Sequence, residues 1–273
     1  MKQLLLSVCI ITYNHEKYIR DAIEGVLMQK VNFSYEIIIA DDYSTDNTRK
    51  IILEYKEKYP ELFKLVFQIK NVGPAQNWLD LLSMSKSNYI AYFEGDDFWI
   101  DEFKLQKQID FLEGNIDYGL TYTNSAILQN NKILDNKLGS NLLKTNLFEA
   151  NCIPTLTVMF RTNHFHSFFS TFNLELKEWI IGDYPFWLWI YCNSKIHYID
   201  CVTSVHRVVE GSASNSGNRF LIKFEAFKIS NFFLKKYNLD EPLKVYIFKR
   251  FSLILTCLNN KPSSIFIVLK LIF

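Results

Sequence analysis

The chain has 273 residues, of which 49% are hydrophobic and 16% aromatic, so it can build a sizeable core and is not an intrinsically disordered protein. Its net charge of +1 conceals an uneven distribution, because residues 219–273 carry a net charge of +7 and the remainder carries −6. Residues 1–218, the acidic part of the chain, have no basic cluster near their carboxylates, which argues against nucleic acid as a partner.

The first half of the chain alternates predicted strands with predicted helices. Apolar runs predict strands at residues 5–11, 35–40, 65–69 and 89–93, and helical periodicity predicts helices at residues 16–29, 46–59, 75–85 and 101–113. This order implies right-handed crossovers and a parallel sheet. The first apolar run lacks a small-residue cleavage site and continues into Thr12, so it is interpreted as a buried strand and not as a signal peptide.

The second half of the chain has a less regular pattern. Strand-like segments are predicted at residues 119–128, 156–161, 196–199 and 202–205, and helices at residues 184–191, 220–237 and 243–258. Gly, Ser, Ala and Asn residues predict a loop at residues 211–217. We expect an α/β fold with a mixed central sheet in residues 1–215, followed by a helical, basic extension in residues 216–273.

The five cysteines form no CxxC pair and no zinc-site spacing, and most of them lie in apolar runs. Free cysteines in such positions behave as small core residues and suit a reducing compartment. No apolar stretch reaches the roughly 18 uninterrupted residues that a membrane-spanning helix needs. We therefore expect a cytoplasmic protein.

Acidic residues occur where predicted strands give way to loops. Asp41 and Asp42 follow one strand, Asp96 and Asp97 follow another, and Asp183 comes later in the chain. Carboxylates at the ends of buried strands are costly unless a cation or hydrogen-bond donors meet them. Because ligands of open parallel sheets bind at the carboxyl ends of the strands, this layout predicts a metal-assisted nucleotide site.

Two common nucleotide-binding motifs are missing from the sequence. No GxGxxG follows the first strand, which disfavours a dinucleotide site, and no GxxxxGK[ST] occurs, which excludes a P-loop. Tyr13 could instead stack on a base, and Asp42 could accept a ring N–H, which would select uracil, thymine or guanine. The alternative for each acid is a structural charge in a loop or at a helix N-terminus.

The segment Glu94–Asp97 reads EGDD. Two adjacent carboxylates repel each other, so a divalent cation is their natural partner, and Mg²⁺ or Mn²⁺ usually binds one or two carboxylates together with substrate phosphates. Such a metal would neutralise the charge that develops on a departing diphosphate. An acidic surface turn is the alternative interpretation.

The sequence resembles the family 2 inverting glycosyltransferases of GT-A fold in three motifs. In chain order these are SVCIITYN at residues 7–14, IIADDYSTD at residues 38–46 and EGDD at residues 94–97. The resemblance covers roughly residues 1–214. It implies a Rossmann-like nucleotide-binding half and the transfer of a sugar from a nucleotide donor, most often a UDP-sugar, to an acceptor hydroxyl. Mg²⁺ or Mn²⁺ is the implied cofactor, and a saccharide or lipid-linked saccharide the implied acceptor.

The resemblance also assigns roles to single residues. Those expected to bind the nucleotide sugar are Thr12, Tyr13, Asn14, Asp42, Asn71, Asp96, His206 and Arg207. Asp42 would bind the base, Asp96 would approach the ribose or the sugar, and Asp97 would coordinate the metal. The family's turn beside the donor often carries an Arg, whereas residues 74–76 contain none, which leaves the diphosphate contact open. His206 would complete the metal shell or contact a phosphate with Arg207, unless both lie in a solvated strand end before Gly211 and Ser212.

Asp183 matches the family's general base. Inversion requires an acceptor hydroxyl that loses its proton while it attacks the anomeric carbon, and aromatic neighbours such as Trp179 would desolvate the carboxylate and make it a stronger base. The alternative is that Asp183 caps the helix at residues 184–191, and both roles are compatible. Trp179 could also stack on an acceptor ring.

The basic tail has two interpretations. Lys244, Lys249 and Arg250 lie among apolar residues and could contact an anionic membrane on the inner face of the plasma membrane. The tail could instead be a helix pair that packs on the domain. A sugar nucleotidyltransferase is one alternative function, but it would need a Gly- and Arg-rich loop after the first strand. A non-catalytic binding relative is another, and Asp42, Asp97 and Asp183 argue against it.

Overall fold

A computed structural model describes residues 4–142, 146–172, 175–177, 179, 182–209 and 219–260 of the chain. The predicted loop at residues 211–217, the predicted boundary between residues 215 and 216 and the apolar end at residues 261–273 lie outside the described residues. The domain boundary therefore stays a prediction.

The first half forms the parallel part of one sheet, with the strand order β3-β2-β1-β4. Its strands are β1 (Leu4–Thr12), β2 (Ser34–Asp41), β3 (Phe63–Phe67) and β4 (Tyr89–Glu94). Its helices are α1 (Ile19–Leu27), α2 (Thr48–Lys58) and α3 (Pro74–Ser83). The predicted alternation and the parallel sheet are confirmed.

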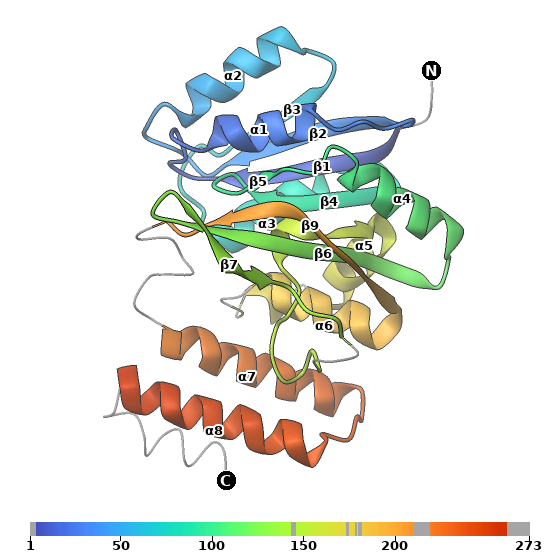
Figure 1. Ribbon diagram of the computed structural model, residues 1–273, viewed down its shortest axis with the longest axis vertical. Coiled ribbons are helices and arrows are strands. Elements are labelled where there is room, and N and C mark those ends of the chain that lie inside the picture. Colours follow the sequence, from blue (N-terminus) through green and yellow to red (C-terminus); the bar gives the residue numbers. More distant parts are fainter. Residues whose placement is uncertain are drawn as a thin grey trace.

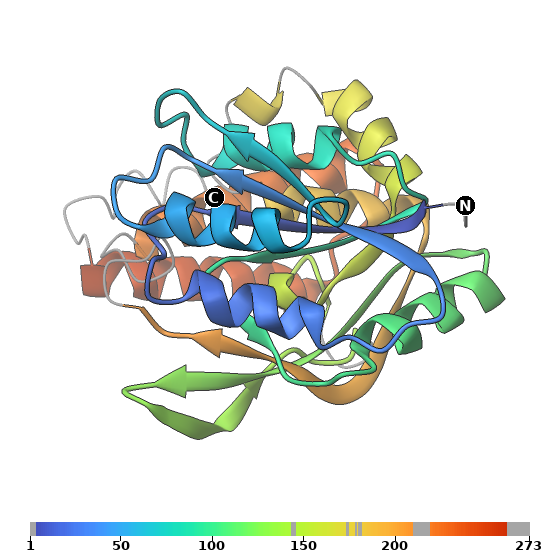
Figure 2. The same ribbon diagram turned by 90° about the horizontal axis from the view of Figure 1, so that it is seen from above.

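Side chains of these strands point alternately into two cores. Val8 and Ile10 of β1 pack on one face with α1 and α2, whereas Cys9 points to the other face with Trp78 of α3. A strand buried on both faces reads as a continuous apolar run, which is why these strands were visible in the sequence. Figure 2 shows helices on both sides of the twisted sheet.

The second half extends the sheet and makes it mixed. Its strands are β5 (Phe98–Trp99), β6 (Tyr118–Gln129), β7 (Lys132–Leu138), β8 (Met159–Arg161) and β9 (Lys195–Arg207). Its helices are α4 (Lys104–Gly114), α5 (Thr162–Phe172) and α6 (Asp183–Asn193), with two short 3-10 turns, η1 (Thr155–Thr157) and η2 (Glu175–Lys177). β8 lies antiparallel between β4 and β6, while β6 and β9 are parallel, so the expected mixed α/β sheet is confirmed.

Some elements differ from their predictions. The two strands expected at residues 196–199 and 202–205 are one continuous strand, β9, and the strand expected at residues 156–161 begins only at Met159, after η1. The hairpin of β6 and β7 and the helix α5 were not predicted. Asn130 and Asn131 both have positive φ, at 51° and 60°, as a tight hairpin turn requires.

The C-terminal segment is a hairpin of two helices, α7 (Arg219–Lys236) and α8 (Leu243–Asn260), as predicted. Figure 1 shows α7 between α6 and α8, so that α8 is the layer farthest from the sheet. Phe232 and Phe233 of α7 pack on Phe172 and Trp179, which fixes the hairpin to the body. No helix within the described residues is both long and apolar enough to span a bilayer.

Candidate active site

The register of the parallel strands brings the predicted site residues to one edge of the sheet. Thr12 of β1 pairs with Asp41 of β2, and Ile11 pairs with Glu94 of β4. The loops that follow these strand ends therefore lie next to one another. They line a cavity of about 840 Å³. Of the residues predicted to bind donor or metal, those on its wall are Thr12, Tyr13, Asn14, Asp42, Asn71, Asp96, Asp97 and His206.

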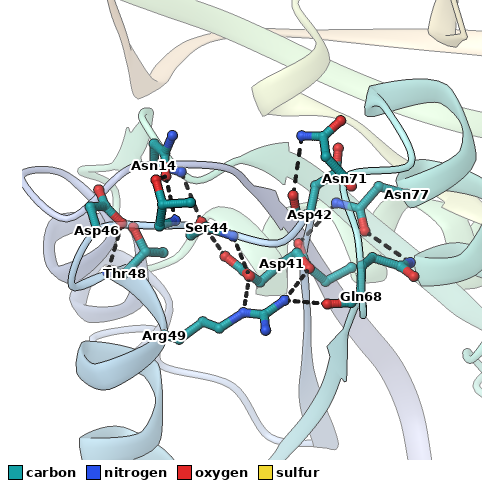
Figure 3. A network of polar contacts seen from close by, with 12 residues as sticks. Asn14, Asp41, Asp42, Ser44, Asp46, Thr48, Arg49, Gln68, Asn71 and Asn77 are labelled. Atoms are coloured by element: carbon teal, nitrogen blue, oxygen red, sulfur yellow. Dashed lines mark hydrogen bonds and ion pairs between the residues drawn. The ribbon is translucent and has the colours of Figure 1, made fainter.

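Asp41 is a structural residue beneath this edge. Its carboxylate is fully buried and accepts hydrogen bonds from the Arg49 guanidinium and from Ser44, whose backbone N–H is 3.0 Å away. Arg49 also donates to the carbonyl oxygen of Gln68 at 2.6 Å (Figure 3). Asp41 thus ties the loop after β2 to α2 and β3, and it is not part of the cavity wall.

Asp42 differs from its neighbour because it lies on the cavity wall. Its carboxylate accepts the backbone N–H groups of Val72 at 2.6 Å and Gly73 at 3.0 Å, and its carbonyl oxygen accepts the Asn71 amide at 3.2 Å. Gly73 has φ +84°, a conformation that favours glycine, and it precedes Pro74 at the start of α3. Asp42 therefore holds the turn at residues 71–73 against the end of β2.

Asn14 fastens the loop after β1 to the loop after β2. Its φ of 55° is one that Asn tolerates, and its side-chain oxygen accepts the Thr45 N–H at 2.8 Å, while its own N–H donates to the Ser44 hydroxyl at 2.8 Å (Figure 3). Tyr13 next to it is 43% exposed on the cavity wall, so its ring is available to a ligand.

The segment Glu94–Asp97 forms the acidic side of the cavity. Asp97 is 2% exposed, accepts the backbone N–H of Arg207 at 2.8 Å, and lies 3.2 Å from Nδ1 of His206. The hydrogen bond that the protonated His206 ring donates to Asp97 raises the pKa of His206. Burial, together with the charges of Asp97, Asp96 and Asp183, raises the pKa of Glu94.

The cavity offers a small set of protein groups that could bind a metal ion. Within the described part of the chain, no three His, Cys, Asp or Glu side chains gather as a complete metal site. Asp97 and His206 lie side by side on the cavity wall, and Mg²⁺ or Mn²⁺ needs only one or two protein groups when phosphates supply the other ligands. The residues present therefore fit a metal site whose remaining ligands come from substrate phosphates. They do not fit a site in which the protein supplies all the ligands.

Asp183 lies behind the cavity wall at the first residue of α6. One of its oxygens accepts the Thr155 hydroxyl at 2.5 Å, and the other accepts the N–H of Tyr184 at 2.7 Å. Thr155 lines the cavity, whereas Asp183 is not among its lining residues. The contact with Tyr184 is not the usual N-cap bond to the second or third helical N–H, so the capping alternative has no support in this geometry. Ile180 and Ile181, which precede Asp183 in its motif, lie outside the described residues.

Two expected partners of the site have other contacts. The Arg207 guanidinium donates to the Asp96 carbonyl at 2.7 Å and to the Asp21 carboxylate at 2.8 Å, and it is not on the cavity wall. It therefore braces the acidic turn from behind, and its contact with a phosphate stays a prediction. Trp179 packs between α5 and α7, so stacking of this side chain on an acceptor is not supported.

His15 and Thr155 lie on the cavity wall, although neither was predicted to be part of the site. His15 follows the first motif directly, and its Nε2 lies 4.0 Å from the Asp96 carboxylate; burial lowers the pKa of His15. Its position right after the strand end was an available signal. Thr155 reaches the cavity from a loop far along the chain, and no sequence spacing predicts that placement.

Known proteins that are similar to this chain include glycosyltransferases. The model of the family described as "Glycosyl transferase family 2" matches residues 7–174. WfgD of Escherichia coli, a UDP-Glc:alpha-D-GlcNAc-diphosphoundecaprenol beta-1,3-glucosyltransferase, is 31% identical over 220 residues, which are 79% of this chain and 82% of that protein. The uncharacterized protein Rv1520 of Mycobacterium tuberculosis is 45% identical over 108 residues, which are 40% of this chain but only 31% of that protein, so the chain spans about a third of this relative.

Solved structures show the same fold. Staphylococcus aureus TarS 1-349 in complex with UDP-GlcNAc has a TM-score of 0.69 at 17% identity over 94% of this chain and 73% of TarS. The mannosyltransferase PcManGT of Pyrobaculum calidifontis, in complex with GDP-Man and Mn²⁺, has a TM-score of 0.62 at 12% identity over 97% of this chain and 78% of that one. The fold is the GT-A fold, and with the family match over residues 7–174 the chain belongs to glycosyltransferase family 2.

Proposed function

We propose that the protein is an inverting glycosyltransferase that moves a sugar from a UDP-sugar to a hydroxyl of a lipid-linked saccharide, in the assembly of a cell-surface polysaccharide or glycolipid. One observation carries the proposal. A single cavity of about 840 Å³ is lined by Asp42, by Asp97 beside His206, and by Thr155, which binds Asp183. These groups match the parts of the reaction: a base, a diphosphate and an acceptor hydroxyl.

Asp42 is proposed to recognise the base. A carboxylate has about four acceptor positions, and the backbone N–H groups of Val72 and Gly73 use two of them. The remaining capacity suits the imide N–H of uracil, and Tyr13 is exposed beside it for stacking. The binding of UDP and of UDP-GlcNAc by TarS supports this choice of base.

The diphosphate needs a positive partner in this cavity. Asp96 and Asp97 would repel it, and Arg207 is directed to Asp21 and Asp96. Asp97 and His206 would hold Mg²⁺ or Mn²⁺, which when bound would neutralise charge on the departing diphosphate. The Mn²⁺ in the PcManGT complex supports a metal of this kind.

Asp183 is proposed to remove the proton of the acceptor hydroxyl. As the acceptor oxygen forms its bond to the anomeric carbon, the bond from that carbon to the diphosphate breaks on the opposite side, and its electron pair leaves with UDP. The configuration at the carbon therefore inverts. The Thr155 hydroxyl bound to Asp183 keeps the carboxylate in one orientation next to the cavity.

The acceptor side of the cavity is mostly apolar. Leu138, Ile153, Pro154 and Leu156 form this wall, which suits the carbon faces of a saccharide. The name of WfgD gives a diphosphoundecaprenol-linked acceptor, which supports a lipid-linked acceptor here. All five cysteines are free, which supports a reaction on the cytoplasmic side.

A panel of UDP-sugars tests the proposal through two readings, thermal stabilisation by the donor and UDP release with an acceptor saccharide. We expect one UDP-sugar with Mn²⁺ to raise the melting temperature of the wild type and of Asp183→Asn alike, because a bound donor stabilises by mass action. Turnover by Asp183→Asn should fall by about 10²–10⁴-fold, the usual contribution of a general base. Full turnover by Asp183→Asn would refute its role, and the lack of stabilisation by every UDP-sugar would refute the donor class.

A further inference from the structure

The outer face of α8 is an apolar stripe. Ile247, Phe251, Leu255 and Leu258 are spaced four, four and three residues apart, so they lie on one side of the helix. They are 56%, 60%, 44% and 49% exposed. Among the described elements, α8 is the layer farthest from the sheet (Figure 1). This outer stripe has no counterpart in the reaction proposed above.

The opposite face of α8 is fixed to α7 by polar contacts. Lys249 is 6% exposed and donates to Glu241 at 2.7 Å, to Ser230 at 2.8 Å and to Asn231 at 2.9 Å. Arg250 donates to the same Glu241 at 3.0 Å. These contacts determine which face of α8 points outward. They also show that Lys249 and Arg250, two of the bases expected to meet a membrane, serve the helix pair instead.

The charge around the stripe is positive. Residues 243–273 contain no Asp or Glu. On α7, the exposed Lys223 donates to Ser252 at 3.2 Å, directly beside Phe251 of the stripe. Among the described residues, neither Lys223 nor the exposed Lys235 forms an ion pair with a carboxylate. An apolar stripe on a positively charged helix pair matches an anionic lipid surface, in which the apolar side chains enter the interface and the ammonium groups meet the headgroups.

A second copy of the chain fits this face less well. A stable protein interface needs roughly 800 Å² from each partner, which is more than four half-exposed side chains of one helix provide. An interfacial helix needs only its apolar face to be buried. We infer that α8 lies on an anionic membrane with Ile247, Phe251, Leu255 and Leu258 in the interface, and that exposed lysines of the helix pair, Lys223 and Lys235 among them, add attraction for the headgroups. This inference stands independently of the proposed sugar transfer.

Sedimentation of the full-length protein with lipid vesicles tests the inference, without nucleotide or metal. One set of vesicles is phosphatidylcholine alone, and the other contains phosphatidylglycerol as well. We expect binding to the anionic vesicles that salt weakens, and roughly tenfold weaker binding for the double variant Phe251→Ser/Leu255→Ser, because two apolar side chains leave the interface. The matched control Ile116→Ser/Ile133→Ser changes two residues that are 85% and 58% exposed elsewhere and should bind like the wild type.

The variant Lys223→Ala/Lys235→Ala provides a second reading that leaves the stripe intact, and it should also weaken binding to the anionic vesicles. Three results would overturn the inference: no binding of the wild type to anionic vesicles, equal binding by the wild type and both variants, or a wild-type dimer in solution that Phe251→Ser/Leu255→Ser abolishes. Because the assay contains no donor sugar, its failure would leave the proposed reaction untouched.

Discussion

Asp41 and Asp42 are neighbours in the chain with different surroundings. Asp41 is fully buried and bound by Arg49 and Ser44, whereas Asp42 reaches the cavity and holds Val72 and Gly73. The strand period of two explains the difference, because consecutive side chains point to opposite sides where β2 ends. One acid therefore builds the edge of the sheet, and the other is free to meet a ligand.

The Thr155 hydroxyl donates a hydrogen bond to Asp183. Removing this hydroxyl gives a testable prediction. Thr155→Val keeps the shape of the side chain but loses the donor to the carboxylate. A hydrogen bond to a charged group contributes about 1.5–3 kcal/mol, so we expect kcat to fall by roughly tenfold to a hundredfold. KM for the donor should stay unchanged, because Thr155 acts through Asp183.

Thr155→Ser is the matched control for this experiment, since it restores the hydroxyl, and its kcat should be close to that of the wild type. Steady-state kinetics of both variants test whether this hydrogen bond matters for turnover. An unchanged kcat in Thr155→Val, or a loss in Thr155→Ser as large as in Thr155→Val, would show that the hydrogen bond does not position the base.

At the scale of elements, the first half of the chain could be predicted from sequence because its strands are buried on both faces. The second half was predicted less completely, and part of its buried surface, between β6 and β9, is polar. Thr123 of β6 and Thr203 of β9 are buried and hydrogen-bonded to each other at 2.6 Å, and Ser125 donates to the Ser204 carbonyl. The predicted division of β9 falls at Asp200, an exposed acid in the middle of the continuous strand.

The candidate site also has a part that could be predicted from the sequence and a part that could not. Residues that follow strand ends, such as Asp42 and Asp97, were predictable because strand order brings their loops together. Thr155 and the apolar wall come from the end of β7 and from the long connection to β8, for which the sequence carries no spacing signal. The sequence therefore indicated the donor side of the cavity and missed most of its acceptor side.

The packing of α1 on β5 depends on Gly25. A Cβ atom at this position would lie 2.9 Å from the backbone nitrogen of Trp99 and 3.0 Å from its carbonyl oxygen, and a backbone cannot move aside easily. We expect Gly25→Ala to lower the free energy of unfolding by about 1–3 kcal/mol, as overpacking of a core usually does. Urea unfolding of the purified variant measures this change.

Gly114→Ala is the matched control, because Gly114 is also helical and a Cβ there would meet nothing within 4 Å. It should leave stability unchanged or raise it by up to about 1 kcal/mol through helix propensity. If both alanine variants unfold at the same urea concentration, the close approach of α1 to Trp99 does not limit the packing.

The stability of the whole molecule should depend on pH through Lys104. Its side chain is fully buried, donates to Gln108 at 2.8 Å and lies over the Trp99 ring at 4.1 Å. Burial lowers the pKa of Lys104 to about 7 from its ordinary value of 10.5. Between these two pH values the unfolded chain binds a proton that the folded chain does not, so the contribution of Lys104 to stability rises with pH in this window.

Urea unfolding at pH 7 and pH 9 measures this dependence. The midpoint of the wild type should rise more between these values than that of Lys104→Met, which has no amine to titrate. Lys107→Met on the same helix is the control, because Asp101 raises the pKa of Lys107 and its amine stays charged in both states up to pH 9. The same pH dependence in the wild type and in Lys104→Met would contradict the burial effect.

The central claim for the whole molecule is that carboxylates from separate strands bind one nucleoside diphosphate together with a metal in one cavity. Calorimetric titration with UDP, in the presence and absence of Mn²⁺, tests it most directly. We predict that Mn²⁺ strengthens UDP binding by the wild type and by the control Asp135→Ala, whose exposed acid lies on β7, and that Asp97→Ala loses this dependence. An equal effect of Mn²⁺ on UDP affinity in the wild type and in Asp97→Ala would contradict the claim.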